Sequence, residues 1–198
     1  MEIKPDDVKN LRDATGAGIM SCKKALEECG GDFDAAVELL RKQGLAKAVK
    51  KIDREAKEGI IYAYIHPGDK IGVLLELNCE TDFVARTEEF RNLAKELALQ
   101  IAACAPIAVS KETIPPEIIE REKAIYETQA KESGKPDQVA KKIAEGKLEK
   151  WMDEVVLLNQ QWIRDPNKKV NELIMEMISK VGENIRVKRF ARFQLGEG

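Results

Sequence analysis

The spacing of the hydrophobic residues changes twice along this chain, and this change limits the folds that it can adopt. Up to about residue 58, apolar side chains recur every three or four positions, whereas between residues 59 and 79 they alternate with other residues. From residue 88 the helical spacing returns. Because a period near 3.6 is typical of amphipathic helices and a period of two is typical of half-buried strands, the sequence predicts an α+β fold. We expect an N-terminal three-helix module followed by an α+β core, in which helices pack on a small antiparallel sheet.

Glycine-containing segments divide the first 44 residues into three short predicted helices. "TGAG" occupies positions 15 to 18 and "GGD" positions 30 to 32, while "QG" at 43 to 44 is predicted to close the third helix. The apolar stripes of the second and third helices are expected to face each other; they contain Cys22, Ala25, Leu26, Cys29, Phe33, Ala36, Val37 and Leu40. Two helices joined by a glycine turn often serve as a docking module. The exposed candidates for partner contacts are Lys9, Arg12, Ile19 and Met20.

Two further segments complete the predicted domain organisation. Residues 45 to 58 combine helix-forming and charged residues, and we expect a connecting helix or semi-rigid linker there. Residues 59 to 198 are predicted to form the core and dimerisation domain, which opens with a β-hairpin around the turn "HPGDK" at 66 to 70. We expect the hairpin to bury one face, formed by Ile61, Ala63, Ile65, Ile71, Val73, Leu75 and Leu77.

The stretch "NCETDFVARTEEF", at 78 to 90, lies where the strand pattern gives way to the helical one. Thr87, followed by two glutamates, is predicted to cap a helix over residues 88 to 104. By composition alone, Phe83 is most simply interpreted as a core aromatic and Asp82 as a helix cap. Neither interpretation explains why a carboxylate stands beside an aromatic ring at this corner.

Helical periodicity dominates the second half of the chain. The pattern predicts a mostly polar helix over residues 116 to 133. It predicts the longest helix over Asp137 to Arg164, where Pro166 ends it. Its apolar seam favours packing within the molecule or between subunits over an extended coiled coil; the seam contains Leu148, Trp151, Val155, Leu158 and Trp162.

The C-terminal residues predict one more helix and a closing strand. The helix is expected over Val170 to Val181, and the strand over "NIRVKRFARFQL". One side of that strand is apolar, with Ile185, Val187, Ala191, Phe193 and Leu195. The other side is basic and is expected to face water, with Arg186, Lys188 and Arg192.

Composition argues against several classes of function. The 33 basic and 35 acidic side chains leave a net charge of −2, so no overall field attracts the chain to nucleic acid or to an anionic membrane. The single histidine, His66, leaves too few groups for Ser-His-Asp or Cys-His catalysis or for a zinc site. The four cysteines form no CxxC pair, and we expect thiols; they are Cys22, Cys29, Cys79 and Cys104. We therefore expect no enzyme, no cofactor and no bound metal.

The N-terminus and the hydropathy pattern give an expectation about location. The first residues lack a basic flank followed by an apolar run, and no later stretch approaches 18 uninterrupted apolar residues. We expect neither a signal peptide nor a transmembrane helix, and hence a cytoplasmic protein with no membrane partner.

Four long segments resemble the elongation factor Ts family and follow the family's order. They are "LRDATGAGIMSCKKALEECGGDFDAAVELLRKQG" at 11 to 44, "LELNCETDFVARTEEF" at 75 to 90, "EGKLEKWMDEVVLLNQQWIRDP" at 145 to 166 and "VGENIRVKRFARFQLGEG" at 181 to 198. The resemblance extends from end to end of the chain. It implies a guanine-nucleotide exchange factor of translation that binds the GDP-bound GTPase elongation factor Tu and releases GDP, without transforming any substrate.

The resemblance also implies roles for individual residues. The N-terminal module resembles a ubiquitin-associated domain and would dock on the GTPase through Lys9, Arg12, Ile19 and Met20. The segment that the family uses to dislodge the nucleotide's Mg²⁺ matches Thr81, Asp82, Phe83 and Val84. Phe83 would insert between helices of the GTPase, while Asp82 would perturb the polar network around the ion. These roles would explain the unusual corner.

Two departures and one difference in length qualify the resemblance. Gln160-Gln161-Trp162 stands where many relatives have Gln-Pro-Phe, and Ile19 stands where many have methionine. The chain resembles the short members, which lack the second core subdomain and coiled coil of longer ones and are expected to pair two chains. We therefore expect a homodimer.

Two other classes of function stay open at this stage. One is a protein-interaction scaffold, with the first 43 residues as the binding module and the remainder as a dimerisation domain. The other is nucleic-acid binding through residues 47 to 57 or the basic side of the last strand. The balanced charge and the lack of interleaved surface aromatics argue against the latter.

Overall fold

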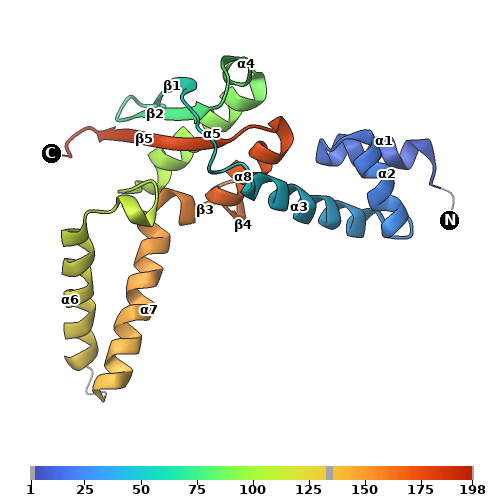
Figure 1. Ribbon diagram of the computed structural model, residues 1–198. Helices are drawn as coiled ribbons and strands as arrows, with labels where there is room; N and C mark the ends of the chain where they lie inside the picture. The colour runs from blue at the N-terminus through green and yellow to red at the C-terminus, as the bar shows by residue number, and fades with distance from the viewer. Residues whose placement is uncertain (1–2, 133–135, 198) are drawn as a thin grey trace. The chain divides into compact units, whose positions relative to one another are not determined.

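The computed structural model describes residues 3–132 and 136–197. Within this part of the chain, helices α1 to α8 and strands β1 to β5 give an α+β fold, as predicted (Figure 1). The chain divides into two compact units, each built from segments that are distant in sequence. Unit 1 contains Met1–Gly59, Asn78–Phe90 and Ile174–Arg186, and unit 2 contains Ile60–Leu77, Arg91–Leu173 and Val187–Gly198.

The first three helices of unit 1 form the predicted N-terminal module. They are α1 (Pro5–Thr15), α2 (Ile19–Glu28) and α3 (Phe33–Val49). Gly16, with a φ of 66°, ends α1, and the Asp32 carboxylate accepts the Ala35 N–H (3.0 Å) to cap α3. The buried core of the module contains Leu11, Cys22, Ala25, Leu26, Ala36 and Leu40. The helical stripes are thus confirmed, except that Phe33 is 39% exposed because it occupies the first helical position after the cap.

The third helix continues beyond its predicted end at Gly44. A Cβ at Gly44 would lie 2.6 Å from the Ser179 Oγ of α8 (Val170–Val181), so this glycine permits close approach of another element. The predicted connecting helix over residues 45 to 58 is therefore only partly correct. Its first residues belong to α3, which ends at Val49, and β1 begins at Glu58.

A three-stranded sheet has the order β1-β2-β5, with β1 over Glu58–Ile65, β2 over Ile71–Cys79 and β5 over Ile185–Gln194. Residues 66 to 70 connect β1 to β2, and a connection this short requires the strands to run antiparallel. The predicted turn is confirmed: the His66 N–H donates to the Ile71 carbonyl (2.8 Å), and Gly68 has a φ of 96°.

The predicted buried face of this hairpin is correct in β2 and wrong in β1. Val73, Leu75 and Leu77 are buried, whereas Ile61 and Ile65 are more than 60% exposed. The register explains the difference, because the Ile65 Cδ1 lies 3.1 Å from the position that a Cβ would take on Gly72. Odd-numbered residues of β1 thus share a face with even-numbered residues of β2.

The last strand also departs from its predicted faces. Ile185 and Val187 are buried, but Lys188 and Arg189 are both exposed and the alternation changes phase there. Arg192, predicted to face water, has its side chain only 14% exposed, and its Nε donates to the Ala102 carbonyl of α5 (3.3 Å). Large apolar side chains of the three strands, and that of Leu195 directly after β5, are consequently left uncovered. We call this surface the open sheet face; it contains Ile61, Ile65, Leu74, Phe193 and Leu195.

The helix α5 (Glu88–Cys104) has the predicted bounds, and Thr87 caps it by accepting the Phe90 N–H (3.3 Å). Its predicted apolar side is buried throughout: Phe90, Leu93, Ala94, Leu97, Ala98, Ile101 and Ala102. The helix α8 also has its predicted bounds.

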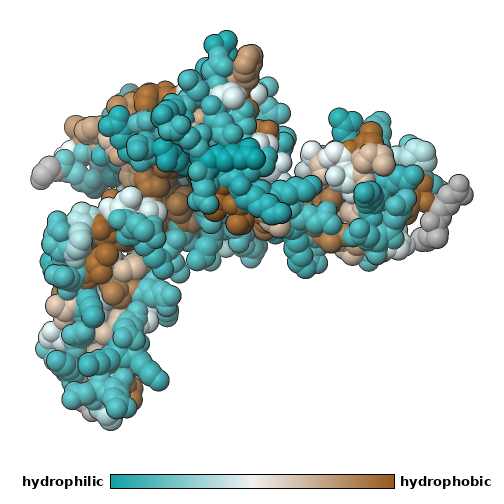
Figure 2. Space-filling view, viewed as in Figure 1, coloured by the Kyte–Doolittle hydropathy of each residue, from teal (hydrophilic) through white to brown (hydrophobic). Residues whose placement is uncertain are grey.

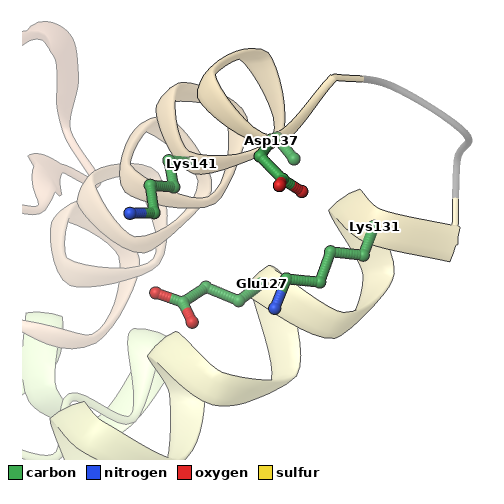
Figure 3. A pocket seen from close by; sticks show the side chains of 5 residues that line it. Glu127, Lys131, Asp137 and Lys141 are labelled. Carbon is green, nitrogen blue, oxygen red and sulfur yellow. The ribbon is translucent and has the colours of Figure 1, made fainter.

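Helices α6 (Pro116–Glu132) and α7 (Asp137–Val155) lie side by side as a two-helix hairpin (Figure 1). Trp151 and Val155 of the predicted seam pack around a small core that also receives Ile118 and Ile119 of α6. Packing within the molecule is therefore confirmed for these two seam residues. Near the tip, residues of both helices line a small hollow of about 180 Å³; the charged ones are Glu127, Lys131, Asp137 and Lys141 (Figure 3).

The helix α7 ends nine residues before the predicted end at Arg164. The chain then forms a 3-10 turn (Leu157–Asn159) and an antiparallel pair of short strands, β3 (Gln161–Trp162) and β4 (Asp165–Lys169). The buried Gln100 of α5 takes over the local hydrogen bonds: its Nε2 donates to the Gln161 carbonyl (3.1 Å), and its Oε1 accepts the Ile163 N–H (2.9 Å). Leu158 and Trp162 therefore do not extend the helical seam. No helix in the described residues has the length and apolarity needed to cross a membrane.

Candidate functional site

The residues singled out from the sequence form two groups, both in unit 1. The first group lies on α1 and α2 of the N-terminal module. Ile19 and Met20 occupy the first turn of α2 and are 55% and 62% exposed, because Cys22, Ala25 and Leu26 supply the buried side of that helix. The basic members of the group, Lys9 and Arg12, are exposed on α1.

The second group is the Thr81–Val84 corner, which consists of residues 81 to 84 between β2 and α5. Residues Asp82–Ala85 form the short helix α4, and the Thr81 side chain caps it by accepting the Val84 N–H (3.4 Å). Phe83 is the second residue of this helix and is 78% exposed. Figure 2 shows hydrophobic surface at α4 bordered by hydrophilic residues.

This geometry decides between the interpretations of the corner. Phe83 is not a core aromatic, and the residue that caps α4 is Thr81 rather than Asp82. The Asp82 carboxylate instead accepts a hydrogen bond from the Arg86 Nη2 (2.7 Å) across one turn. Exposed pairs of this kind stabilise a helix by only about 0.3–0.5 kcal/mol, so Asp82 can exchange this partner for another at little cost.

A turn far along the chain holds the corner in place. The Glu183 carboxylate accepts both the Thr81 N–H (3.0 Å) and the Thr81 hydroxyl (2.6 Å). The Glu80 carboxylate accepts the Asn184 N–H (2.6 Å). The Asn184 side chain, itself 1% exposed, donates to the Ile52 and Arg54 carbonyls (2.9 and 2.6 Å). Three segments of unit 1 that are distant in sequence are thus joined around Thr81.

The sequence interpretation missed Glu183 and Asn184. The segment "GEN" at 182 to 184 stood out only as the approach to a strand. Gly182, with a φ of 80°, does mark the end of α8, but a local pattern does not reveal which distant backbone groups a turn will bind.

Cys79, at the end of β2, lies beneath the corner. Its Sγ donates to the Thr81 carbonyl (3.1 Å), and the side chain is fully buried. Burial raises the pKa of this thiol to about 11, and the nearby Glu183 carboxylate acts in the same direction. Cys79 is therefore a structural thiol, because only the thiolate is a strong nucleophile.

This raised pKa predicts a stability change in alkaline solution. The folded protein keeps the thiol proton up to about pH 11, whereas an unfolded chain releases it near the ordinary value of 9.0. The contribution of Cys79 to stability is thus complete below pH 9 and is lost as the pH rises toward 11. We expect the free energy of unfolding, measured with urea at several pH values, to fall more steeply across this window in the native chain than in Cys79→Ala. Parallel curves would contradict this assignment.

The chemistry available at these two groups is that of a binding surface. Among residues 3–132 and 136–197, no group of three or more His, Cys, Asp or Glu side chains is arranged to hold a metal ion. What the two groups present is exposed apolar side chains in the first turns of α2 and α4, together with the exposed charged residues Lys9, Arg12 and Asp82. Large apolar side chains in such positions are typical of sites where another protein binds.

Comparison with known proteins places the chain in a family. The family model described as "Elongation factor TS" matches residues 33–197. The Elongation factor Ts of Thermodesulfovibrio yellowstonii is 60% identical over 197 residues, which cover 100% of this chain and 98% of that protein. The proteins of the same name from Thermotoga petrophila and Fervidobacterium nodosum are 58% and 55% identical, and this chain covers 98% and 100% of their lengths. The chain therefore belongs to the elongation factor Ts family of translation factors.

Proposed function

We propose that this protein binds GDP-bound elongation factor Tu in the cytoplasm and promotes GDP release, so that GTP can bind in its place. It is not an enzyme in this proposal, because it changes the affinity of a partner rather than a covalent bond. The exposed ring of Phe83 on a hydrogen-bonded corner is the observation that carries the proposal. A stability role does not explain this ring, because most of its surface gains nothing from burial in the chain itself.

The proposed mechanism uses the two groups of residues for different steps. Ile19 and Met20 of α2, together with Lys9 and Arg12 of α1, dock on the GTPase and account for most of the affinity. Phe83 then inserts between helices of the GTPase and shifts the groups that hold Mg²⁺ and the phosphates. The weakly held carboxylate of Asp82 competes for the polar partners of the ion. Strain in the GTPase thereby lowers its affinity for GDP.

Thermodynamic linkage sets the scale of this mechanism. The factor by which the protein lowers GDP affinity equals the factor by which GDP lowers the affinity of the protein for the GTPase. Burial of one phenylalanine side chain contributes roughly 1.5–3 kcal/mol, or about one to two decades. Loosening a nucleotide from nanomolar to micromolar affinity requires about three decades, so burial of Phe83 alone does not account for it.

The proposal is tested by stopped-flow release of a fluorescent GDP analogue from elongation factor Tu. We expect the native chain to accelerate release strongly, with saturation as its concentration rises. An unchanged release rate at saturating protein would exclude the exchange function.

We also propose that the active form is a homodimer. The open sheet face supports this, because its five large apolar side chains are between 46% and 76% exposed. Four of them, Ile65, Leu74, Phe193 and Leu195, line a hollow of about 500 Å³ near the turn between β1 and β2, where Figure 2 shows hydrophobic surface. Apolar surface of this kind is rarely left open in a monomer. In a dimer with two-fold symmetry, the open sheet face of one subunit can pack against the same face of the other.

The homodimer is expected to depend on the open sheet face. Light scattering at micromolar concentration should give twice the chain mass of 22.2 kDa for the native protein. Phe193→Asp places a charge in the contact and should give the single-chain mass, because an unpaired buried carboxylate is strongly unfavourable. Ile125→Asp, at a residue of α6 that is 42% exposed, is the matched control and should remain dimeric. A native protein with the single-chain mass would exclude the dimer.

A protein-interaction scaffold is the alternative from another class of function. In that case, capture of the GTPase would be indifferent to GDP, to Mg²⁺ and to replacement of Phe83. The exchange function requires all three to matter. Steeply salt-dependent binding of RNA would instead favour the nucleic-acid alternative.

A further inference from the structure

Two carboxylates connect the turn at residues 80–81 with the turn at residues 182–184, because each accepts a backbone N–H of the other turn. Glu183 accepts the backbone N–H of Thr81 (3.0 Å), and Glu80 accepts the backbone N–H of Asn184 (2.6 Å). Each turn thus supplies the acceptor that the backbone of the other needs. Glu183 also accepts the hydroxyl of Thr81 (2.6 Å), the residue that caps α4, whereas Glu80 pairs with Arg54 (3.6 Å).

We propose that Glu183 is a positioning residue of the exchange site and holds Phe83 ready for insertion through Thr81. This inference rests on the proposed role of Phe83. In the proposed mechanism Glu183 contacts neither the GTPase nor the nucleotide. It acts only by orienting the Thr81–Val84 corner.

The Thr81 hydroxyl connects Glu183 to α4. A hydroxyl has one proton to donate and can accept with its lone pairs. Its proton goes to the Glu183 Oε1 at 2.6 Å, a length typical of a charge-assisted hydrogen bond. The oxygen therefore faces the Val84 N–H (3.4 Å) with its lone pairs, and donation to a carboxylate makes it a stronger acceptor.

The helix that carries Phe83 depends on this cap. Helix α4 is four residues long, far shorter than a helix that is stable by itself in water. Phe83 is 78% exposed, so few contacts of its own ring determine its direction. The Thr81 backbone is held at its N–H by Glu183 and at its carbonyl by the Cys79 Sγ (3.1 Å). The backbone that carries the ring is consequently held before Phe83 by Glu183 and Cys79, and after it by the Thr87 hydroxyl, which donates to the Val84 carbonyl (2.8 Å).

Pre-ordering of the corner has a specific kinetic consequence. A ring that is already oriented inserts at a smaller entropic cost, whereas a mobile corner must be ordered at that step. Loss of Glu183 should therefore lower the maximal rate of GDP release at saturating protein. The protein concentration that gives half of that rate should stay near the native value, because docking through Ile19 and Met20 is unaffected.

The test is a double-mutant cycle between Glu183→Gln and Phe83→Ala in stopped-flow GDP release. The amide of Glu183→Gln has one acceptor in place of two, and its NH₂ group opposes a donor of Thr81. We expect Glu183→Gln to lower the maximal rate about tenfold in the native background and by less than about twofold in the Phe83→Ala background. Glu76→Gln is the matched control, because it weakens the hydrogen bond that Glu76 accepts from the Arg189 Nε (2.7 Å) by removing the carboxylate charge, and it should leave the rate unchanged.

Hydrogen exchange in the free protein gives a second, activity-independent readout. Amides in a peptide covering residues 80–90 should exchange faster in Glu183→Gln than in the native chain, and at the native rate in Glu76→Gln. Unchanged exchange in Glu183→Gln would overturn the inference even if the release rate fell.

The outcomes separate this inference from the proposed function. If Phe83→Ala loses activity but Glu183→Gln keeps the native maximal rate, Glu183 is not a positioning residue and the proposed function stands. An equal loss from Glu183→Gln in both backgrounds would also overturn its action through Phe83. If the native chain itself fails to accelerate release, the proposed function falls, and the inference falls with it.

Discussion

Replacement of Phe83 by alanine is expected to slow protein-stimulated GDP release by a factor of about 10 to 100. The ring is 78% exposed in the free protein, so its removal costs little folding energy, and nearly all of its effect should appear in the complex. The measurement is the maximal rate of stopped-flow release at saturating protein, with thermal melting to show that the variant folds as the native chain does.

Ile125→Ala is the matched control for Phe83→Ala. It also removes an exposed apolar side chain, from α6, and the mechanism gives it no role. Equal rates for native protein and Phe83→Ala would eliminate insertion of the ring as the cause of exchange. Equal losses in Phe83→Ala and Ile125→Ala would mean that exposed apolar surface in general is responsible.

The combined replacement Ile19→Ser and Met20→Ser is expected to have a still larger effect on association. Burial of two such side chains contributes roughly 3–6 kcal/mol, so the half-saturating concentration should rise by about two to four decades. Both residues are more than half exposed at the start of α2, outside the core of the N-terminal module. The maximal release rate, if saturation can be reached, should stay close to the native value, in contrast with Phe83→Ala.

The control for this pair is Ile125→Ser combined with Val139→Ser, two exposed apolar residues of α6 and α7. This control should leave the half-saturating concentration unchanged. A truncated chain of residues 50–198 addresses the same point. Exchange by this truncated chain at the native rate would mean that the N-terminal module is not needed for docking.

Local periodicity was sufficient to predict the helices that have a clean apolar side and a cap. The bounds of α5 and α8 follow from such patterns, and the hydroxyl of Thr87 caps α5 as expected. The same reasoning failed for α7, because the apolar spacing continues after Val155 while the backbone does not. Gln100, some 60 positions away, binds the backbone of residues 161 to 163 and replaces the helical hydrogen bonds there.

Strand alternation identified the hairpin but not its buried face. An alternating pattern fixes which residues of one strand share a face, but the pairing of two strands determines which faces coincide. The close approach of Ile65 to Gly72 shows that pairing here. The open sheet face was missed for that reason, and the exposed apolar residues of β1 and β5 supply the evidence for the proposed dimer.

The candidate site was located by resemblance rather than by composition. Composition alone favoured a buried Phe83, because most phenylalanines are in cores. Phe83 is exposed on a capped turn, and the capping residue Thr81 is bound by Glu183, a contact that no local pattern revealed. The proposed roles of the corner and of the N-terminal module remain predictions until release rates are measured.

The hydrogen bond between Thr81 and Glu183 spans 102 positions in the chain, and this separation bears on the order of events during synthesis. A nascent chain emerges from the ribosome N-terminus first, so the N-terminal module can fold while α8 and β5 have yet to be made. Glu183 becomes available to Thr81 only when residues 182 to 184 have been made. Incomplete chains would thus carry the docking helices without an ordered Phe83. Such chains would bind the GTPase before they could promote the release of its GDP.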